Sequence, residues 1–284
     1  MPSFSWDLIW RQFRKHRLAT IAAVVMAMLI LLSLAGPMLS PYSFREYDAE
    51  AILQPPSSRH PLGTDELGRD ILTRLLWGGR VSLSVGIAAM LVALAIGTTF
   101  GALAGYYGGI LDNVLMRLTD LVLAFPALFL YLILSAFFNT GLFHLILIIG
   151  SMSWMEVARL VRGAFLTLKQ LEYAQAARAV GAGDRRIIFR HLLPNALASL
   201  IVATILGIAS AILYEAALSY LGLGIQPPWP SWGNMLSNSQ SYVWTAPALA
   251  VYPGLCIFVT VLCCNLLGDG LRDALDPRLK QTTE

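Results

Sequence analysis

Few residues of this chain have the type and spacing that catalysis or metal binding requires. Its only lysines are Lys15, Lys169 and Lys280, and none of them follows a glycine. The chain therefore lacks the phosphate-binding loop G-x-x-x-x-G-K-[ST]. Its four histidines are far apart in the sequence, without the i, i+4 pair typical of metal sites. The stretch "GSMSW" lacks the second glycine of a nucleophile elbow. We expect no catalytic residue, no metal site and no cofactor bound by this chain.

Glu215 is the only carboxylate that we place well inside one of the long apolar runs. It continues a series of small residues at four-residue intervals, consisting of Ala203, Gly207, Ala211 and Ser219. A charge near mid-membrane costs about 2.5–3.5 kcal/mol on insertion scales, so Glu215 should face protein or a cavity. Two interpretations stay open: a pathway-lining acid, or a hydrogen bond to a neighbouring helix or subunit. His144, in another apolar run, is predicted to be packed or pathway-lining rather than a ligand.

The elements that must position these residues are membrane spans. The composition is 57% hydrophobic and 13% charged, whereas soluble domains average about 45–50% and about 25%. Dividing the apolar runs at their breakers predicts an all-α integral membrane protein with six spans. They cover about 18–36, 81–105, the two parts of 121–155 divided at "NTG" (139–141), 196–221 and 247–267. The first run is longer than a typical signal-peptide core, which disfavours cleavage there.

The basic residues predict the topology. One cluster precedes the first span, and the other occupies 156–195, four spans later, so both lie on the same side. Cytoplasmic loops are rich in Lys and Arg. We therefore expect a cytoplasmic N-terminus (1–17), a cytoplasmic C-terminal tail (269–284) and a core of 81–268. The segments 37–80 and 223–246 should lie outside, although Arg69, Arg74 and Arg80 depart from the charge rule.

Two further patterns concern packing. From Thr64 onward, leucines and Ile71 at i, i+4 spacing predict an amphipathic helix lying on the outer membrane surface. The second span carries small residues at four-residue intervals, at Ala89, Ala93, Gly97, Gly101 and Gly105. Such residues let helix backbones approach closely in lipid, so we expect this ridge to pack inside the protein.

The segment "EYAQAARAVGAGDRRIIFRHLLPN" (172–195) is the most charged stretch in the second half of the chain. We predict a small-faced helix from Leu171 that ends at Gly181 and Gly183. Asp184 should cap a second helix, and Pro194 should enter the first turn of the fifth span. Such a projection suits either a groove on a soluble protein or an anionic lipid surface.

This segment resembles the cytoplasmic EAA loop of ABC importer permeases. Gln175, Ala176 and Ala177 fill its first positions, Gly181 follows at the right spacing, and Leu193-Pro194 closes the motif. Gln175 replaces the usual Glu, and His191 the usual Ile. Four further stretches are similar to C-type permeases of dipeptide, oligopeptide and nickel importers. They are "HPLGTDELGRDILTRLLWGGRVSLSVG", "GYYGGILDNVLMRLTDLVLAFP", "LSYLGLGIQPPWPSWGNML" and "NLLGDGLRDALDPRLK".

The resemblance implies a type I ABC importer permease in the bacterial inner membrane. It also implies a second homologous permease forming a heterodimer, two cytoplasmic ATPase subunits that use ATP and Mg²⁺, and an extracytoplasmic substrate-binding protein. Nucleic acid has no part in it. The residues expected to couple to the ATPases are Gln175, Ala176, Ala177, Gly181, Ala182 and Asp184.

The cargo is less constrained than the machinery. Peptides are the family's usual cargo, and nickel, glutathione or another small solute is the alternative. Two other classes of protein fit less well. An integral-membrane enzyme lacks a catalytic motif here, and a secondary transporter would show inverted repeats and several intramembrane charges.

Overall fold

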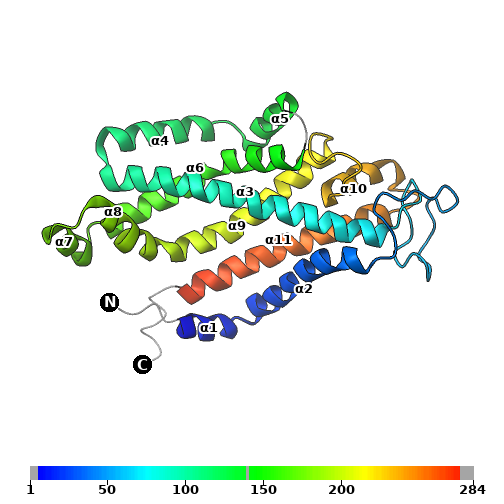
Figure 1. Cartoon of the computed structure of the whole chain (residues 1–284), viewed down its shortest axis with the longest axis horizontal. Coiled ribbons are helices and arrows are strands. Elements are labelled where there is room, and N and C mark those ends of the chain that lie inside the picture. The colour runs from blue at the N-terminus through cyan, green and yellow to red at the C-terminus, as the bar shows by residue number, and fades with distance from the viewer. Residues whose placement is uncertain (1–5, 139–140, 276–284) are drawn as a thin grey trace.

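The computed structural model describes residues 6–138 and 141–275, and every regular element of that part is a helix. Figure 1 shows an elongated bundle of long helices with shorter elements at both ends. The long helices are α2 (Arg17–Leu39), α3 (Ile71–Tyr107), α6 (Leu142–Leu168), α9 (Leu193–Tyr220) and α11 (Ala248–Leu275). The short helix α1 (Trp6–Lys15) precedes α2.

The number of spans agrees with the prediction. Five helices of the described chain are long and apolar enough to cross a membrane. The pair α4 (Gly109–Leu123) and α5 (Ala127–Phe137) supplies a sixth span if it is counted as one. The third span, expected over the first part of 121–155, begins earlier, at Gly109, and α4 and α5 are bent by 85° at their break. Pro126 precedes α5 in an extended conformation and cannot donate a backbone hydrogen bond to continue α4.

The ridge of small residues on α3 packs inside the protein, as expected. A Cβ added at Gly97 would lie 2.6 Å from the carbonyl oxygen of Trp154 in α6. One added at Gly101 would lie 2.5 Å from the carbonyl oxygen of Ala158. Only glycine allows these two backbones to approach so closely, and α3 and α6 consequently form the central pair of the bundle (Figure 1).

The prediction of a surface helix from Thr64 onward is wrong. Helix α3 begins at Ile71 and runs without interruption into the second span. Asp70 caps this helix, since its carboxylate accepts a 2.8 Å hydrogen bond from the backbone NH of Thr73. Gly68, with a φ of 74°, lies in the turn before it. The polar outer segment therefore covers 40–70, and residues 71–80 belong to the spanning helix.

Two of the three arginines that departed from the charge rule, Arg69 and Arg74, are paired with neighbouring acids, whereas Arg80 donates to the carbonyl oxygen of Leu34. Arg69 is buried and pairs with Asp65 and Glu66, each at 2.7 Å. Arg74 lies 3.2 Å from Asp65. Desolvation by burial, followed by the charge of Asp65, raises the pKa of the Glu66 carboxyl. Arg69 and Arg74 therefore stabilise the local fold of the outer segment and are weak indicators of membrane orientation.

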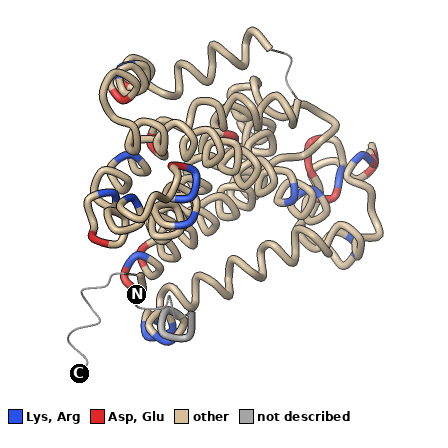
Figure 2. Tube along the Cα trace, turned by 60° about the vertical axis from the view of Figure 1, so that its left-hand side comes forward, with Lys and Arg blue, Asp and Glu red and all other residues tan. Residues whose placement is uncertain are grey.

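The two basic clusters that predicted the topology lie at the same end of the molecule. His16 contacts Asp273 of α11 at 2.7 Å, which joins the start of α2 to the last turns of α11. Helix α7 (Glu172–Ala179) lies at this end, and α10 (Trp232–Ser239) lies at the other. Charged residues gather at both ends, with long uncharged stretches between them (Figure 2). Residues 269–275 of the predicted tail continue α11, and 276–284 are outside the described residues.

Candidate functional site

The segment around α7 differs from its predicted shape in one respect. Helix α7 ends at Ala179 as expected, but the second helix does not end before the fifth span. Helix α8 (Asp184–Arg186) continues through a π-helical turn, η1 (Ile187–Leu192), directly into α9. A single rod therefore runs from Asp184 to Tyr220. Pro194 lies just after the π-helical turn, and it has no backbone NH to donate to the carbonyl groups of that turn.

Gly181 makes the turn between α7 and this rod. Its φ is 84°, a left-handed conformation that residues with a Cβ adopt at a cost of about 1–2 kcal/mol. No neighbouring atom lies within 4 Å of a Cβ built at this position. The requirement for glycine is therefore conformational rather than steric. Gly183, two residues later, has an ordinary φ of −68°.

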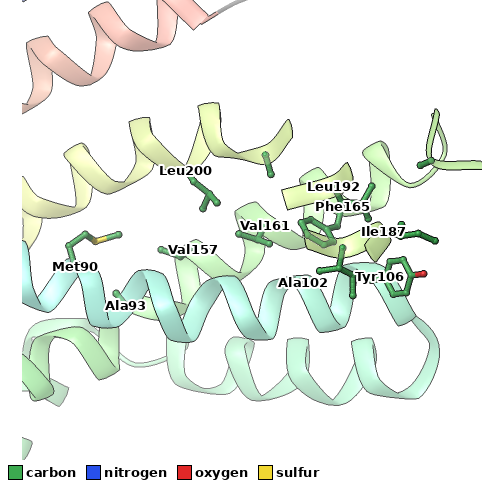
Figure 3. Close-up of a cluster of buried hydrophobic side chains, with 13 residues drawn as sticks. Met90, Ala93, Ala102, Tyr106, Val157, Val161, Phe165, Ile187, Leu192 and Leu200 are labelled. Carbon is green, nitrogen blue, oxygen red and sulfur yellow. The ribbon is translucent and has the colours of Figure 1, made fainter. Parts of the chain in front are cut away.

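One face of helix α7 packs against a buried apolar cluster. Ala174 is buried, and it belongs to a cluster with Tyr106 of α3, Phe165 of α6, and Ile187 and Leu192 of η1. Figure 3 shows the labelled members of this cluster, which come from α3, α6, η1 and α9. This apolar cluster holds α7 in a fixed position relative to α3, α6 and α9.

The opposite face of α7 is open. Gln175 and Ala176 are exposed, Ala177 is half-buried, and the side chain of Val180 is 87% exposed. The amide nitrogen of Gln175 donates a 2.9 Å hydrogen bond to the carbonyl oxygen of Gln170. The predicted coupling residues 175–177 therefore present a small, largely uncharged surface to solvent.

Asp184 does not cap the second helix as predicted. The N-cap is Gly183, and the Asp184 carboxylate instead accepts a 2.6 Å hydrogen bond from the hydroxyl of Tyr106. The Arg178 guanidinium lies 5.6 Å from the centre of the Tyr106 ring. Tyr106 thus joins α7, the rod and α3. Nothing in the sequence "GYYGG" indicates this role rather than that of an ordinary loop residue. Ala182 is half-buried against the same cluster.

A cavity of about 280 Å³ lies between α3, the α4–α5 break, α6 and α9. Its wall is mostly apolar, with a few polar side chains. These are Tyr131, Ser153, Glu156, Ser210 and Tyr214.

Glu156 was missed from the sequence, because the fourth apolar run was ended at Met155. Helix α6 continues to Leu168, so Glu156 lies inside it. The inference that Glu215 is the only carboxylate well inside a span is therefore wrong.

Glu215 is fully buried and does not line this cavity. Its carboxylate accepts hydrogen bonds of 2.8 Å from the hydroxyl of Ser82 in α3 and 2.7 Å from that of Ser219 in α9. These contacts match the interpretation of Glu215 as a link to a neighbouring helix, and its pathway role stays a prediction. His144 lies exposed in the first turn of α6, away from the cavity, and its pathway role also stays a prediction.

Comparison with known proteins gives this arrangement a family. Residues 97–281 match the family described as binding-protein-dependent transport system inner membrane component. Residues 5–56 match the N-terminal transmembrane domain of oligopeptide transport permease C.

Two relatives resemble nearly the whole chain. The glutathione transport system permease protein GsiD of Pectobacterium atrosepticum is 45% identical, over 97% of this chain and 92% of that protein. The dipeptide transport system permease protein DppC of Alkalihalophilus pseudofirmus is 42% identical, over 97% of this chain and 90% of that protein.

The fold is also found in a solved structure. A chain of the MetNI methionine ABC transporter, crystallised in inward facing conformations, superposes with a TM-score of 0.57 at 20% identity. The match covers 72% of this chain and 97% of that chain. With the family models and the relatives, it places the chain among the multi-pass inner-membrane components of binding-protein-dependent transport, as a C-type permease subunit of the dipeptide, oligopeptide and nickel family of ABC importers.

Proposed function

We propose that this permease forms half of the translocation pathway for short peptides. The observation that carries the proposal is the likeness to permeases named for dipeptide and for glutathione transport, at 42% and 45% identity over 97% of the chain. Glutathione is itself a tripeptide, so the two named cargoes share a class. Nickel or another small solute is the second candidate, since a separate binding protein delivers the cargo in this kind of system.

We further propose that the open face of α7 docks in a groove of a cytoplasmic ATPase subunit. Three features support this: the exposed small residues around Ala176, the left-handed turn at Gly181 and the buried apolar cluster that contains Ala174. ATP and Mg²⁺ are then used by two partner ATPases, and this chain transmits their motion. Gln175, Ala176, Ala177, Gly181, Ala182 and Asp184 form or support this coupling surface.

The proposed assembly contains a second, homologous permease and an extracytoplasmic binding protein. The α7 end of the bundle, which includes both predicted cytoplasmic clusters, faces the cytoplasm. The outer segment 40–70 and α10 then face the binding protein or the partner permease. The competing docking mode for α7 is an anionic lipid surface, favoured by the exposed residues Arg185, Arg186 and Arg190.

The cargo is tested through the substrate-binding protein that works with this permease. That protein is titrated with a panel of dipeptides, with glutathione and with nickel, and the complete importer is then assayed for uptake of the ligands that bind. We expect short peptides to bind and to be imported. Binding and uptake of nickel alone would replace peptide with the second candidate, while leaving the permease assignment intact.

A further inference from the structure

The cavity beside the α4–α5 break contains one charged wall residue, Glu156. The other polar wall residues are the hydroxyl side chains Tyr131, Ser153, Ser210 and Tyr214, and the rest of the wall is apolar. The Ser153 hydroxyl donates to the carbonyl oxygen of Ile149, and it accepts a 3.1 Å hydrogen bond from the Tyr131 hydroxyl. The cavity is therefore mostly apolar, with a single acidic side chain in its wall.

The position of Glu156 along α6 places it at membrane depth. It follows the start of the helix at Leu142 by about 21 Å, at a rise of about 1.5 Å per residue. The hydrocarbon core of a bilayer is about 30 Å thick. An ionisable residue at such a depth is costly, so it faces a partner, a cavity or a pathway rather than lipid.

The nearby basic side chains do not neutralise this charge. Arg159, one turn along α6, lies 2.5 Å from Asp120 of α4. Arg162, a further turn along, donates a bidentate pair of hydrogen bonds to the carboxylate of Asp112, at 2.5 and 2.7 Å. Within residues 6–138 and 141–275, Glu156 has no Lys, Arg or His partner within salt-bridge distance.

We propose that Glu156 gives the translocation pathway a negative potential and favours cargo that carries an ammonium group. A peptide carries such a group at its N-terminus, and a lysine side chain adds another. The carboxylate attracts the ammonium group electrostatically, and the surrounding hydroxyls supply hydrogen-bonding partners. The inference rests on the proposed function for its cargo, but the potential in the cavity is a property of the protein alone.

The potential is measured without any cargo, on the assembled importer. Ser210, exposed on α9 in the same cavity wall, is changed to cysteine. The thiol is then labelled with a cationic and with an anionic methanethiosulfonate reagent of similar size. The protein without this cysteine corrects for labelling of Cys256, Cys263 and Cys264.

We expect Glu156→Gln to lower the cationic-to-anionic rate ratio about tenfold, a change equivalent to about 1.4 kcal/mol. The control is Asp269→Asn, which removes an exposed carboxylate from α11 and should leave the ratio unchanged. An equal ratio with and without the Glu156→Gln substitution overturns the proposal, whatever cargo the importer carries.

The second arm measures uptake of dipeptides with net charges of +1, 0 and −1 that the same binding protein delivers. Glu156→Gln should lower the ratio of cationic to anionic peptide uptake, and Glu156→Asp should largely restore it. A merely structural role would reduce all three uptakes equally and leave the ratio unchanged, which would contradict the proposal. If the wild-type importer moves no peptide, the proposed cargo fails, and the labelling ratio alone decides the role of Glu156.

Discussion

At the scale of single residues, Glu215 and Glu156 have different surroundings. Glu215 has hydroxyl donors for both of its oxygens, whereas Glu156 faces a cavity. The Ser82 and Ser219 hydroxyls that contact Glu215 also accept from the backbone NH groups of Trp232 and Ile225. Glu215 thereby ties α9 to α3 and to the start of α10.

Replacing Glu215 with alanine should destabilise the protein strongly. The change leaves buried hydroxyls without an acceptor, at about 1–3 kcal/mol for each group left unpaired. Glu215→Gln retains one acceptor and should cost less. The midpoint of thermal unfolding of the purified importer measures both, with Glu50→Ala in the exposed outer segment as control. An unchanged midpoint for Glu215→Ala would remove the structural role, and changed uptake by a stable Glu215→Gln protein would favour the pathway role.

Sequence reasoning located Glu215 but missed Glu156 for a physical reason. A hydropathy run ends at the first charge, and the charges at positions 156, 159 and 162 follow in quick succession. The helix continues through them because Glu and Arg are good helix formers. Asp120 and Asp112 of α4 pair with Arg159 and Arg162, and these partners cannot be identified without the fold.

At the scale of elements, the number of spans could be predicted and their connections could not. Apolar length identified six spans, since burying that length in lipid is what holds them there. The bend between α4 and α5, and the unbroken rod through η1, depend on local backbone geometry and on neighbours that hydropathy does not report. Gly181 was correctly predicted to end the helix, because glycine is the residue that most readily adopts the positive φ found there.

The contact between Tyr106 and Asp184 joins α3 to the rod and should affect coupling. Tyr106→Phe removes a hydrogen bond to a charged acceptor while keeping the ring in the cluster. We expect the number of peptides imported per ATP hydrolysed to fall about two- to fivefold, a change equivalent to roughly 0.4–1 kcal/mol. Proteoliposome uptake and ATPase assays measure this ratio.

The matched control is Tyr107→Phe, because Tyr107 is the next residue and is 53% exposed. It should leave the ratio unchanged. Equal ratios for wild type, Tyr106→Phe and Tyr107→Phe would mean that this hydrogen bond has no part in transmission, and that the apolar cluster alone joins the elements.

At the scale of the whole molecule, the proposed orientation can be read from two exposed side chains. Val180, the residue that follows α7, is 87% exposed, and Trp244, near α10, is 96% exposed. In intact cells, a membrane-impermeant maleimide should label Trp244→Cys and not Val180→Cys. Vesicles turned inside out should give the reverse pattern. Labelling of Val180→Cys from outside in intact cells would invert the orientation and remove α7 from the reach of an ATPase.

The central claim is that α7 carries the motion of an ATPase into the spans through its fixed turn. The most direct measurement is peptide imported per ATP hydrolysed by the complete importer in proteoliposomes, for Gly181→Val and Gly183→Val. Valine is strained at the φ of 84° of Gly181 and is accommodated at the φ of −68° of Gly183. We expect Gly181→Val to hydrolyse ATP with little uptake, while Gly183→Val and wild type import alike. Wild-type uptake per ATP by Gly181→Val, at equal membrane abundance, would contradict it.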